Sequence, residues 1–324
     1  MNAANPHISA NKTAYRLFCQ QQQAHLPLWI YDWYLDACCQ EGQWDVALVE
    51  EKGRVVAALP YFIKEKWGFR YITMPMFVKN MGPYVIPDKR ALKHTHKYYA
   101  QLIEQLPQMA SFKQNFYVTC SNWLPFYWKN YQQTTYYTYQ FDDLSDLSKI
   151  ETQFNRSVRR KLRKASAQLE LKFDLLTPAA FYEINTLSFQ RQGKKTPYSL
   201  AQFLTLDAAL AKHHARQFFY AQDATGKIHS AAYLVWDSHT AYYLLSGDVP
   251  ELRKSGSGFF LIWKAIQYTK NVLGLNTFDF EGSIIQRLET IRVHFGAKQV
   301  PYFYVWKTPS KFYRLLEYLK DGIL

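Results

Sequence analysis

The sequence predicts a mixed α/β (α+β) fold of two domains, each with a mainly antiparallel mixed sheet flanked by helices. The chain has 324 residues, more than one domain usually holds. Hydrophobic residues make up 48% and charged residues 20%, enough apolar side chains for two cores and too many for a disordered chain. Each half also shows the same succession of short strand patterns and longer helical patterns.

The second half opens with the alternating run Leu169 to Leu176, which is typical of a strand. Helical patterns follow over residues 178–192 and 199–214. Short turns then separate three strand patterns, so we expect antiparallel hairpins over residues 217–222, 228–236 and 241–246.

A helix over residues 258–272 comes next, because its apolar residues recur at helical spacing and Gly274 is a typical terminator. Alternating strand patterns and helical patterns continue to the end of the chain. They predict a strand at 277–280, a helix at 284–295, a strand at 300–306 and a helix from Ser310.

The first half gives nearly the same order of elements, which indicates a duplicated architecture; coincidence of two unrelated mixed domains is the alternative. The most polar central stretch, Asp142 to Lys149, places the boundary, so we expect domains over residues 1–145 and 146–324. The patterns predict helices near 13–22, 29–39, 89–105 and 123–130, and strands near 44–50, 54–63, 69–74, 113–120 and 135–141.

Charge and cysteine content narrow the class of protein. Lys and Arg number 39 against 26 Asp and Glu, a surplus of +13 that attracts nucleic acid, phosphorylated cofactors or acidic membrane surfaces without choosing among them. The four cysteines lack metal or redox spacing, and the histidines show no zinc pattern, so we expect no metal. We find no signal peptide or membrane-spanning run and expect a cytoplasmic protein, with membrane-surface association left open.

The sharpest local feature is the segment Arg253 to Gly258 (RKSGSG), which precedes the long predicted helix. Glycines let a ligand approach the backbone, and the free amides at a helix N-terminus favour phosphate. Arg253 and Lys254 add positive charge. The segment therefore predicts a phosphate or pyrophosphate site, although Ser255 or Ser257 as a plain helix cap explains the same pattern.

This segment resembles the acyl-coenzyme A pyrophosphate loop of the GNAT N-acyltransferase superfamily. Phe278 to Ser283 (FDFEGS), Ile291 to Ala297 (IRVHFGA) and Pro301-Tyr302 resemble the C-terminal signature of its Fem-like branch, the peptidoglycan-bridge FemABX and acetyltransferase-like proteins. The resemblance is good over residues 150–308 and rests on element order before that. It implies two tandem GNAT-like domains. The long helical arm that tRNA-using Fem enzymes generally carry is missing here, which favours an acyl-CoA donor.

The resemblance implies that acyl-CoA, such as acetyl-CoA, lies between two strands that separate, Tyr242 to Ser246 and Phe278 to Phe280. Backbone amides of the first strand would then polarise the thioester. The expected donor-binding residues are Leu245, Ser246, Arg253, Lys254, Ser255, Gly256, Ser257 and Gly258.

An amine acceptor must lose a proton, and Tyr243, Asp279 and Glu281 are the candidate catalytic residues. Strand packing for Tyr243, and amide binding or pairing with arginine for the two carboxylates, are the structural alternatives. The basic helix from Arg156 to Lys164 has a charged face that is either simply solvated or a dock for an anionic partner. The candidate anion-binding residues are Arg156, Arg160, Arg163 and Arg292.

We therefore expect an N-acyltransferase that moves an acyl group from acyl-CoA to an amine by direct attack. The amine belongs to a small molecule or a cell-wall precursor. Two alternatives keep the fold: an aminoacyl-tRNA-dependent Fem-type transferase, and a GNAT-shaped binding protein without turnover. The sequence leaves the acceptor, the acyl group and the oligomeric state open.

Overall fold

A computed structural model describes residues 9–173, 176–282 and 286–321. Its contacts divide the chain into two compact units. Unit 1 comprises residues 1–136 and 301–324, and unit 2 comprises residues 137–300. This division differs from the expected domains 1–145 and 146–324, because two strands leave the half of the sequence in which they arise.

Unit 2 contains a mixed sheet in the order β6-β11-β10-β9-β8-β7. Its pairs are antiparallel except β10 with β11, which are parallel. The strands are the end of β6 (Gln132–Phe141), β7 (Leu169–Phe173), β8 (Arg216–Asp223), β9 (Ile228–Trp236), β10 (Thr240–Asp248), β11 (Thr277–Asp279) and the start of β12 (Lys298–Lys307).

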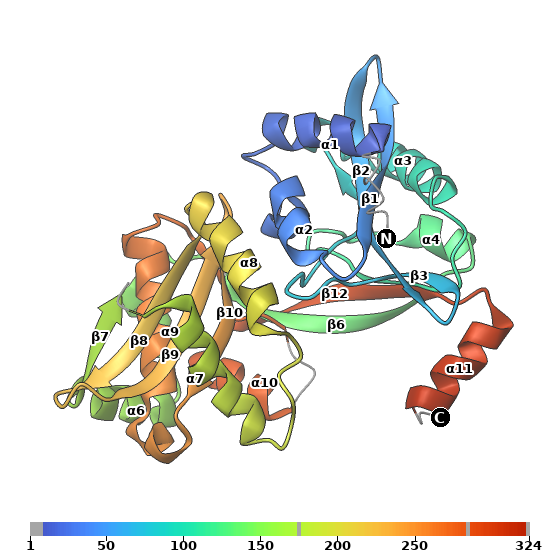
Figure 1. Ribbon diagram of the computed structural model, residues 1–324. Coiled ribbons are helices and arrows are strands. Elements are labelled where there is room, and N and C mark those ends of the chain that lie inside the picture. Colours follow the sequence, from blue (N-terminus) through green and yellow to red (C-terminus); the bar gives the residue numbers. More distant parts are fainter. Residues whose placement is uncertain (1–8, 174–175, 283–285, 322–324) are drawn as a thin grey trace. The chain divides into compact units, whose positions relative to one another are not determined.

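Helices cover both faces of this sheet (Figure 1). On one face, α9 (Ser257–Asn271) packs with α6 (Arg156–Ser166) over a core that includes Leu162, Leu234 and Ile266. On the other face lie α7 (Pro178–Gln190) and α8 (Leu200–Lys212), whose aromatic rings contact those of the strands. The remaining helices are α5 (Leu147–Gln153) and α10 (Gln286–Phe295).

Unit 1 has a smaller sheet in the order β1-β2-β3-β5-β12, with β4 also paired to β2. Its parallel pair is β3 with β5, joined through Ile72 and Phe112. The elements are α1 (Ala10–Gln21), η1 (Leu28–Ile30), α2 (Asp32–Cys38), β1 (Gln43–Glu51), β2 (Arg54–Lys66), β3 (Phe69–Thr73), β4 (Tyr84–Val85), η2 (Pro87–Lys89), α3 (Leu92–Glu104), β5 (Phe112–Asn115), α4 (Leu124–Trp128) and α11 (Lys311–Asp321).

The two units repeat one plan and exchange their last strands. In each unit, antiparallel strands lead to one parallel pair, with a helix in the connection between its strands. The end of β6 pairs with β11 in unit 2, whereas Tyr304 to Lys307 of β12 pair with β5 in unit 1. The predicted fold of two tandem mixed domains is therefore confirmed, and the exchange explains why both domain boundaries differ.

Most predicted elements of the second half agree with the structure to within two or three residues. The polar stretch Asp142 to Lys149 carries no clear helical pattern, yet it leads into α5, which begins where Asp146 accepts hydrogen bonds from two backbone amides. The two-residue strand β4 is also absent from the sequence prediction. Positions 174–175 of the first predicted strand, 284–285 of a predicted helix and Ser283 of the motif lie outside the described residues.

A substitution at Gly247 of β10 tests how closely α7 packs against the sheet. A Cβ atom at this position would lie 2.4 Å from the Ile184 carbonyl oxygen and 2.6 Å from the Asn185 Cα atom. Because both atoms belong to backbone, we expect Gly247→Ala to lower the free energy of unfolding by about 2 kcal/mol. Urea unfolding followed by circular dichroism measures the change.

Gly53→Ala is the control, since Gly53 has φ of +73° and a Cβ atom there would meet no neighbouring atom within 4 Å. It should cost about 1 kcal/mol from backbone strain alone. A loss at Gly247 no larger than at Gly53 would contradict the described packing of α7.

Candidate functional site

Strands β10 and β11 separate after a short parallel pairing. Their register ends at Tyr242 and Asp279. Beyond that point β11 stays with β6, since the Phe280 amide donates to the Tyr139 carbonyl at 2.9 Å. On its other side β10 carries a β-bulge at Leu244, where its register with β9 shifts. A bulge bends a strand and turns its backbone groups. Past the bulge, Leu245 and Ser246 remain paired with β9, while the register with β11 does not extend to them.

The segment Arg253 to Gly258 lies at the start of α9, as predicted. Gly256 adopts φ of +84° and ends the preceding 3-10 helix, η3 (Pro250–Ser255). Its left-handed conformation directs the chain into α9 and leaves the first amides of that helix at the turn. Ser255, Gly256 and Ser257 are buried, whereas Arg253 and Lys254 are exposed and Gly258 is half-buried. An anion therefore has to approach from the side of the two cations and Gly258.

The basic helix α6 lies directly against this turn. A Cβ atom on Gly256 would be 3.0 Å from the Lys161 carbonyl oxygen, and Lys164 Nζ donates to the Lys254 carbonyl at 2.8 Å. Lys161 Nζ sits 3.8 Å from the ring centre of Phe259 in α9. The structure thus brings together two features that sequence reasoning treated separately.

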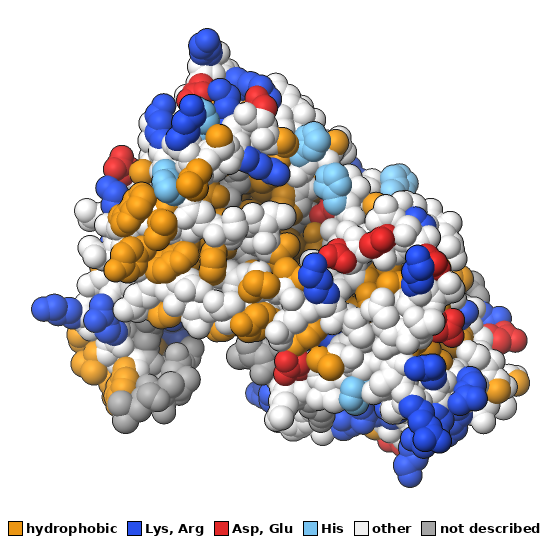
Figure 2. Space-filling model, turned by 180° about the vertical axis from the view of Figure 1, so that it is seen from behind, with side chains coloured by type: hydrophobic (Ala, Val, Ile, Leu, Met, Phe, Trp, Pro, Cys, Tyr) orange, Lys and Arg blue, Asp and Glu red, His pale blue; other side chains and the backbone are white. Residues whose placement is uncertain are grey.

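Positive charge accumulates where α6 meets the turn. Arg156, Arg160, Arg163 and Lys164 are exposed on the outer face of the helix, while Val158, Leu162 and Ala165 face the core. Figure 2 shows Lys and Arg side chains gathered on this part of unit 2, at lower right. Burial lowers the pKa of Lys161, and the charges of Arg160 and Arg253 lower it further. Such mutual repulsion is relieved when an anion binds.

At the turn, an anion would meet the guanidinium of Arg253 and the hydroxyl of Ser257. Arg253 Nε donates to Asp248 Oδ2 at 3.2 Å, so the end of β10 holds the guanidinium beside the turn. The Ser257 hydroxyl oxygen is buried and finds no hydrogen-bond partner among the described residues. The Ser257 amide already donates to Ser255 Oγ at 3.3 Å, so an oxyanion would meet the orphaned hydroxyl and the amides that follow Ser257.

Asp279 is the centre of a buried hydrogen-bond network at the end of β11. Its Oδ1 accepts from the Thr138 hydroxyl and from the Glu281 amide, and its Oδ2 accepts from Gln140 Nε2 at 2.7 Å. Burial raises the pKa of Asp279, while these hydrogen bonds and the charge of Arg292 oppose the rise. Both carboxylate oxygens are engaged, so the geometry matches the structural alternative, with the side chain fixing β11 to β6.

Glu281 and Arg292 lie together behind this network. Glu281 is buried and has φ of +64°, a conformation that non-glycine residues seldom adopt, and the Asp279 carboxylate holds its amide. Arg292 of α10 donates to the Phe280 carbonyl at 3.2 Å. Burial lowers the pKa of Arg292, and the carboxylates of Glu281 and Asp279 act in the opposite direction. Arg292 therefore lies among carboxylates. It is not part of the basic face of α6, with which the sequence analysis had grouped it.

Tyr243 lies on β10 where the strands separate, and its ring packs 6.3 Å from that of Phe278. Burial raises the pKa of Tyr243 far above its ordinary value, and the charge of Asp248 adds to the rise. At neutral pH the residue is a protonated phenol. The raised pKa makes it a weaker acid than an ordinary tyrosine, so it can donate a hydrogen bond but holds its proton.

Two residues that sequence reasoning missed hold β10 from the other face. Asn185 of α7 donates from Nδ2 to the Ser246 carbonyl at 2.7 Å. The Tyr198 hydroxyl in turn donates to Oδ1 of Asn185. Ser246 itself is exposed and Leu245 half-buried. The only signal in the sequence was a polar residue at a buried helical position, which points to a hydrogen-bonded role without naming its partner.

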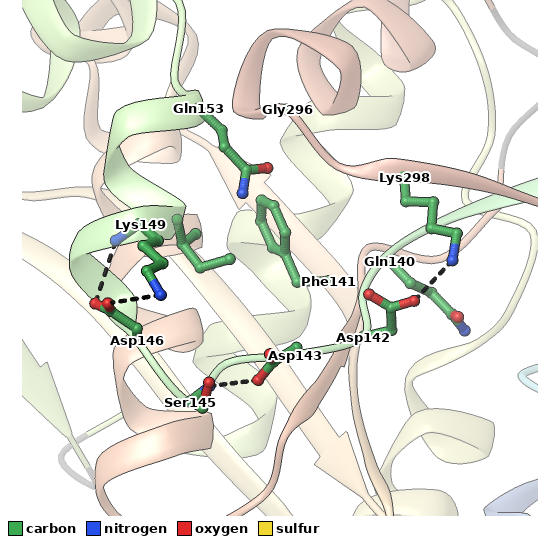
Figure 3. A pocket seen from close by; sticks show the side chains of 11 residues that line it. Gln140, Phe141, Asp142, Asp143, Ser145, Asp146, Lys149, Gln153, Gly296 and Lys298 are labelled. Carbon is green, nitrogen blue, oxygen red and sulfur yellow. Dashed lines mark hydrogen bonds and ion pairs between the residues drawn. The ribbon is translucent and has the colours of Figure 1, made fainter.

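A separate hollow of about 220 Å³ lies in unit 2 where β6 leads into α5 (Figure 3). Its carboxylates already have partners: Asp142 pairs with Lys298 at 2.8 Å, and Asp146 caps α5 and pairs with Lys149. Hydrogen bonds from Ser145 lower the pKa of Asp143. The acidic side chains here stabilise the turn into α5. This hollow is not the place where β10 and β11 separate.

Within residues 9–173, 176–282 and 286–321, no group of three His, Cys, Asp or Glu side chains is arranged to hold a metal ion. No helix in those ranges has both the length and the apolar character needed to cross a bilayer.

Comparison with known families gives one match, which covers most of unit 2. Residues 152–284 match the family described as Acetyltransferase (GNAT) domain. The matched region contains α6, the bulged strand β10, the turn at Gly256 and β11. No curated protein sequence matches the chain.

Solved structures share the fold over nearly the whole chain at low sequence identity. FemX aligns with a TM-score of 0.70 at 14% identity, covering 95% of this chain and 99% of FemX. A C-terminal domain of a putative lysylphosphatidylglycerol synthetase from Agrobacterium fabrum aligns at 0.58 and 12%, covering 94% and 96%. A tandem GNAT protein from the clavulanic acid biosynthesis pathway aligns at 0.52 and 11%, covering 94% and 96%. These likenesses support the tandem fold.

Replacing Asp279 separates a structural from a purely chemical role. We expect Asp279→Ala to lower the free energy of unfolding by roughly 3 kcal/mol, because three buried donors lose their acceptor. Chemical denaturation measures the loss. Asp142→Ala is the matched control just after β6, where an exposed ion pair is worth less than about 1 kcal/mol. Unchanged stability of Asp279→Ala would show that the network does not fix β11.

Proposed function

We propose that the chain, whose residues 152–284 match the Acetyltransferase (GNAT) domain family, is an acyltransferase that transfers an acyl group from acyl-CoA to an amine. The separation of β10 from β11, followed by the cation-lined turn into α9, is the observation that carries this proposal. In this proposal the donor extends from the place where the two strands separate to the start of α9.

In this proposal the turn at α9 holds the diphosphate of the donor. The amides that follow Ser257 in α9 and the Ser257 hydroxyl donate hydrogen bonds, and Arg253 and Lys254 supply charge from the exposed side. Asp248 keeps Arg253 at the turn through their ion pair. Leu245 and Ser246 of β10 flank the thioester arm of the donor.

The reaction is direct attack of the amine nitrogen on the thioester carbonyl, with no covalent enzyme intermediate. Backbone amides of β10 beside the bulge at Leu244 stabilise the oxyanion that develops, because they are fixed before the reaction begins. The carbon–nitrogen bond forms and the carbon–sulfur bond breaks. The Asn185 hydrogen bond to Ser246 keeps this part of β10 in place.

Two protons have to move. Tyr243 remains protonated at neutral pH, so we assign it a hydrogen bond to the departing thiolate, which then takes a proton from solvent. The amine loses its proton to solvent or to Glu281, whose backbone is held by Asp279. Asp279 acts in this scheme as a positioning residue, since both its oxygens already accept hydrogen bonds.

We propose a small-molecule or cell-wall-precursor amine as the acceptor and the cytoplasm as the place of reaction. The four free, buried cysteines Cys19, Cys38, Cys39 and Cys120 support a reducing compartment.

Removing the two exposed cations of the turn should weaken donor binding selectively. We expect the double variant Arg253→Gln, Lys254→Gln to bind acetyl-CoA and coenzyme A about tenfold more weakly, because two charge-assisted contacts to phosphate are lost. Isothermal titration calorimetry measures the dissociation constants. Both side chains are exposed, so the fold should be retained.

Lys194→Gln, Lys195→Gln is the matched control, another adjacent and exposed pair of cations in unit 2. It should bind both ligands as the unaltered chain does. If the unaltered chain binds neither acetyl-CoA nor coenzyme A at millimolar concentration, the donor assignment is wrong.

The breadth of the basic surface favours a second candidate donor, aminoacyl-tRNA. Arg156, Arg160 and Arg163 extend the positive charge along α6 beyond the turn, further than one diphosphate requires. A polyanion would contact the whole face and release counterions on binding.

This second candidate makes a prediction about salt. If tRNA is the donor, its affinity should fall steeply with salt, and Arg160→Ala, Arg163→Ala should reduce the slope of log K against log salt by about 2. Filter binding over a salt series measures the slope. Binding that does not depend on salt, or a slope that the variant leaves unchanged, excludes the tRNA donor.

A further inference from the structure

The C-terminal helix α11 exposes an apolar stripe on unit 1. Phe312, Leu315 and Leu319 recur at the spacing of one helical face and are 60%, 52% and 70% exposed. Tyr313 attaches the helix to the sheet, since its ring lies 5.5 Å from Phe69 and 5.7 Å from Tyr71 of β3. One side of α11 is therefore docked on the sheet, and large apolar side chains point into solvent on another.

The hairpin between β2 and β3 continues this surface. Trp67 and Gly68 form its two-residue turn, both with positive φ, and Trp67 is 63% exposed at the tip. Phe69, two residues later, contacts Phe312 of α11 at a ring distance of 5.8 Å. The indole at the tip and the stripe on α11 thus belong to one surface, which we call the α11–hairpin surface.

Positive charge surrounds these apolar groups. Lys311 and Arg314 are exposed on α11, and Lys66 and Arg70 are exposed at the hairpin, where Lys66 Nζ lies 4.2 Å from the ring centre of Trp67. Among the hairpin residues from Glu65 to Arg70, Glu65 is the one acidic side chain. In the sequence, α11 and the hairpin from Glu65 to Arg70 together contain five cations and three acidic residues, so cations remain in excess.

We propose that the α11–hairpin surface binds anionic lipid bilayers. An amphipathic helix with aromatic and leucine side chains on one face and cations beside them is suited to the interface of a bilayer. Leu315, Leu319 and Phe312 enter the acyl region, and Trp67 lies at headgroup level, where indole rings are favoured. Lys and Arg side chains meet the lipid phosphates, which gives preference for anionic lipid. A partner protein of purely apolar complementarity would leave those cations without counter-charges.

Vesicle co-sedimentation of the full chain tests the proposal directly, independently of acyl transfer. The chain should pellet with phosphatidylcholine vesicles that contain about one third phosphatidylglycerol and bind pure phosphatidylcholine at least several-fold more weakly. Leu315→Glu, Leu319→Glu should lower binding about tenfold or more, since two apolar anchors become charged. Trp67→Ala should lower binding severalfold without altering α11.

Leu17→Glu and Leu92→Glu are matched controls, because both leucines are exposed on unit 1 helices away from this surface. They should bind vesicles as the unaltered chain does. Equal loss in the controls, or no sedimentation of the unaltered chain with anionic vesicles, overturns the proposal. So does analytical ultracentrifugation showing that the α11 substitutions abolish a dimer while vesicle binding is absent, which would assign the surface to a second copy of the chain.

Discussion

The separation of β10 from β11 is the constraint on which the rest of unit 2 depends. A parallel pair that continued to the end of β10 would use its amides in the sheet, and none would remain for a ligand. Two features end the pairing: the bulge at Leu244 bends β10, and the Asp279 network keeps β11 with β6. Three hydrogen bonds offset the free-energy cost of burying Asp279. Together they hold β11 against β6, while β10 bends away from β11.

The contact between α6 and the turn at Gly256 is the second requirement. Lys161 touches the turn through its backbone and Lys164 through its terminal amine, so a helix rich in cations supports the turn into α9. The support also buries Ser255 to Ser257, which restricts access to the side of Arg253, Lys254 and Gly258. The packing that makes the turn rigid also keeps a ligand away from its buried residues. A ligand can reach the turn from the side of the exposed cations.

Much of the fold was predictable because strand and helix patterns in the second half are strong and their connections short. The basic helix and the segment from Arg253 to Gly258 were both found by composition and position. Their contact was not, since no local pattern relates Lys161 to Gly256. The partners of Asp279 were also hidden, because Thr138 and Gln140 arise in the first half of the sequence. The same reason explains the domain boundaries: alternation in β6 and β12 identifies strands without saying which sheet they join.

The repeat in unit 1 explains why the donor site is assigned to unit 2. Its parallel pair, β3 with β5, is also connected through a helix, α3, so the same plan is present. That connection, however, contains β4, which pairs back onto β2, and α3 follows Ala91 without a glycine in a left-handed turn. Unit 2 instead passes from β10 through one short 3-10 helix to Gly256 and α9. Both units therefore have a strand–helix–strand crossover, but the short, glycine-ended connection beside a basic helix occurs at the crossover of unit 2. The proposed phosphate site depends on that difference.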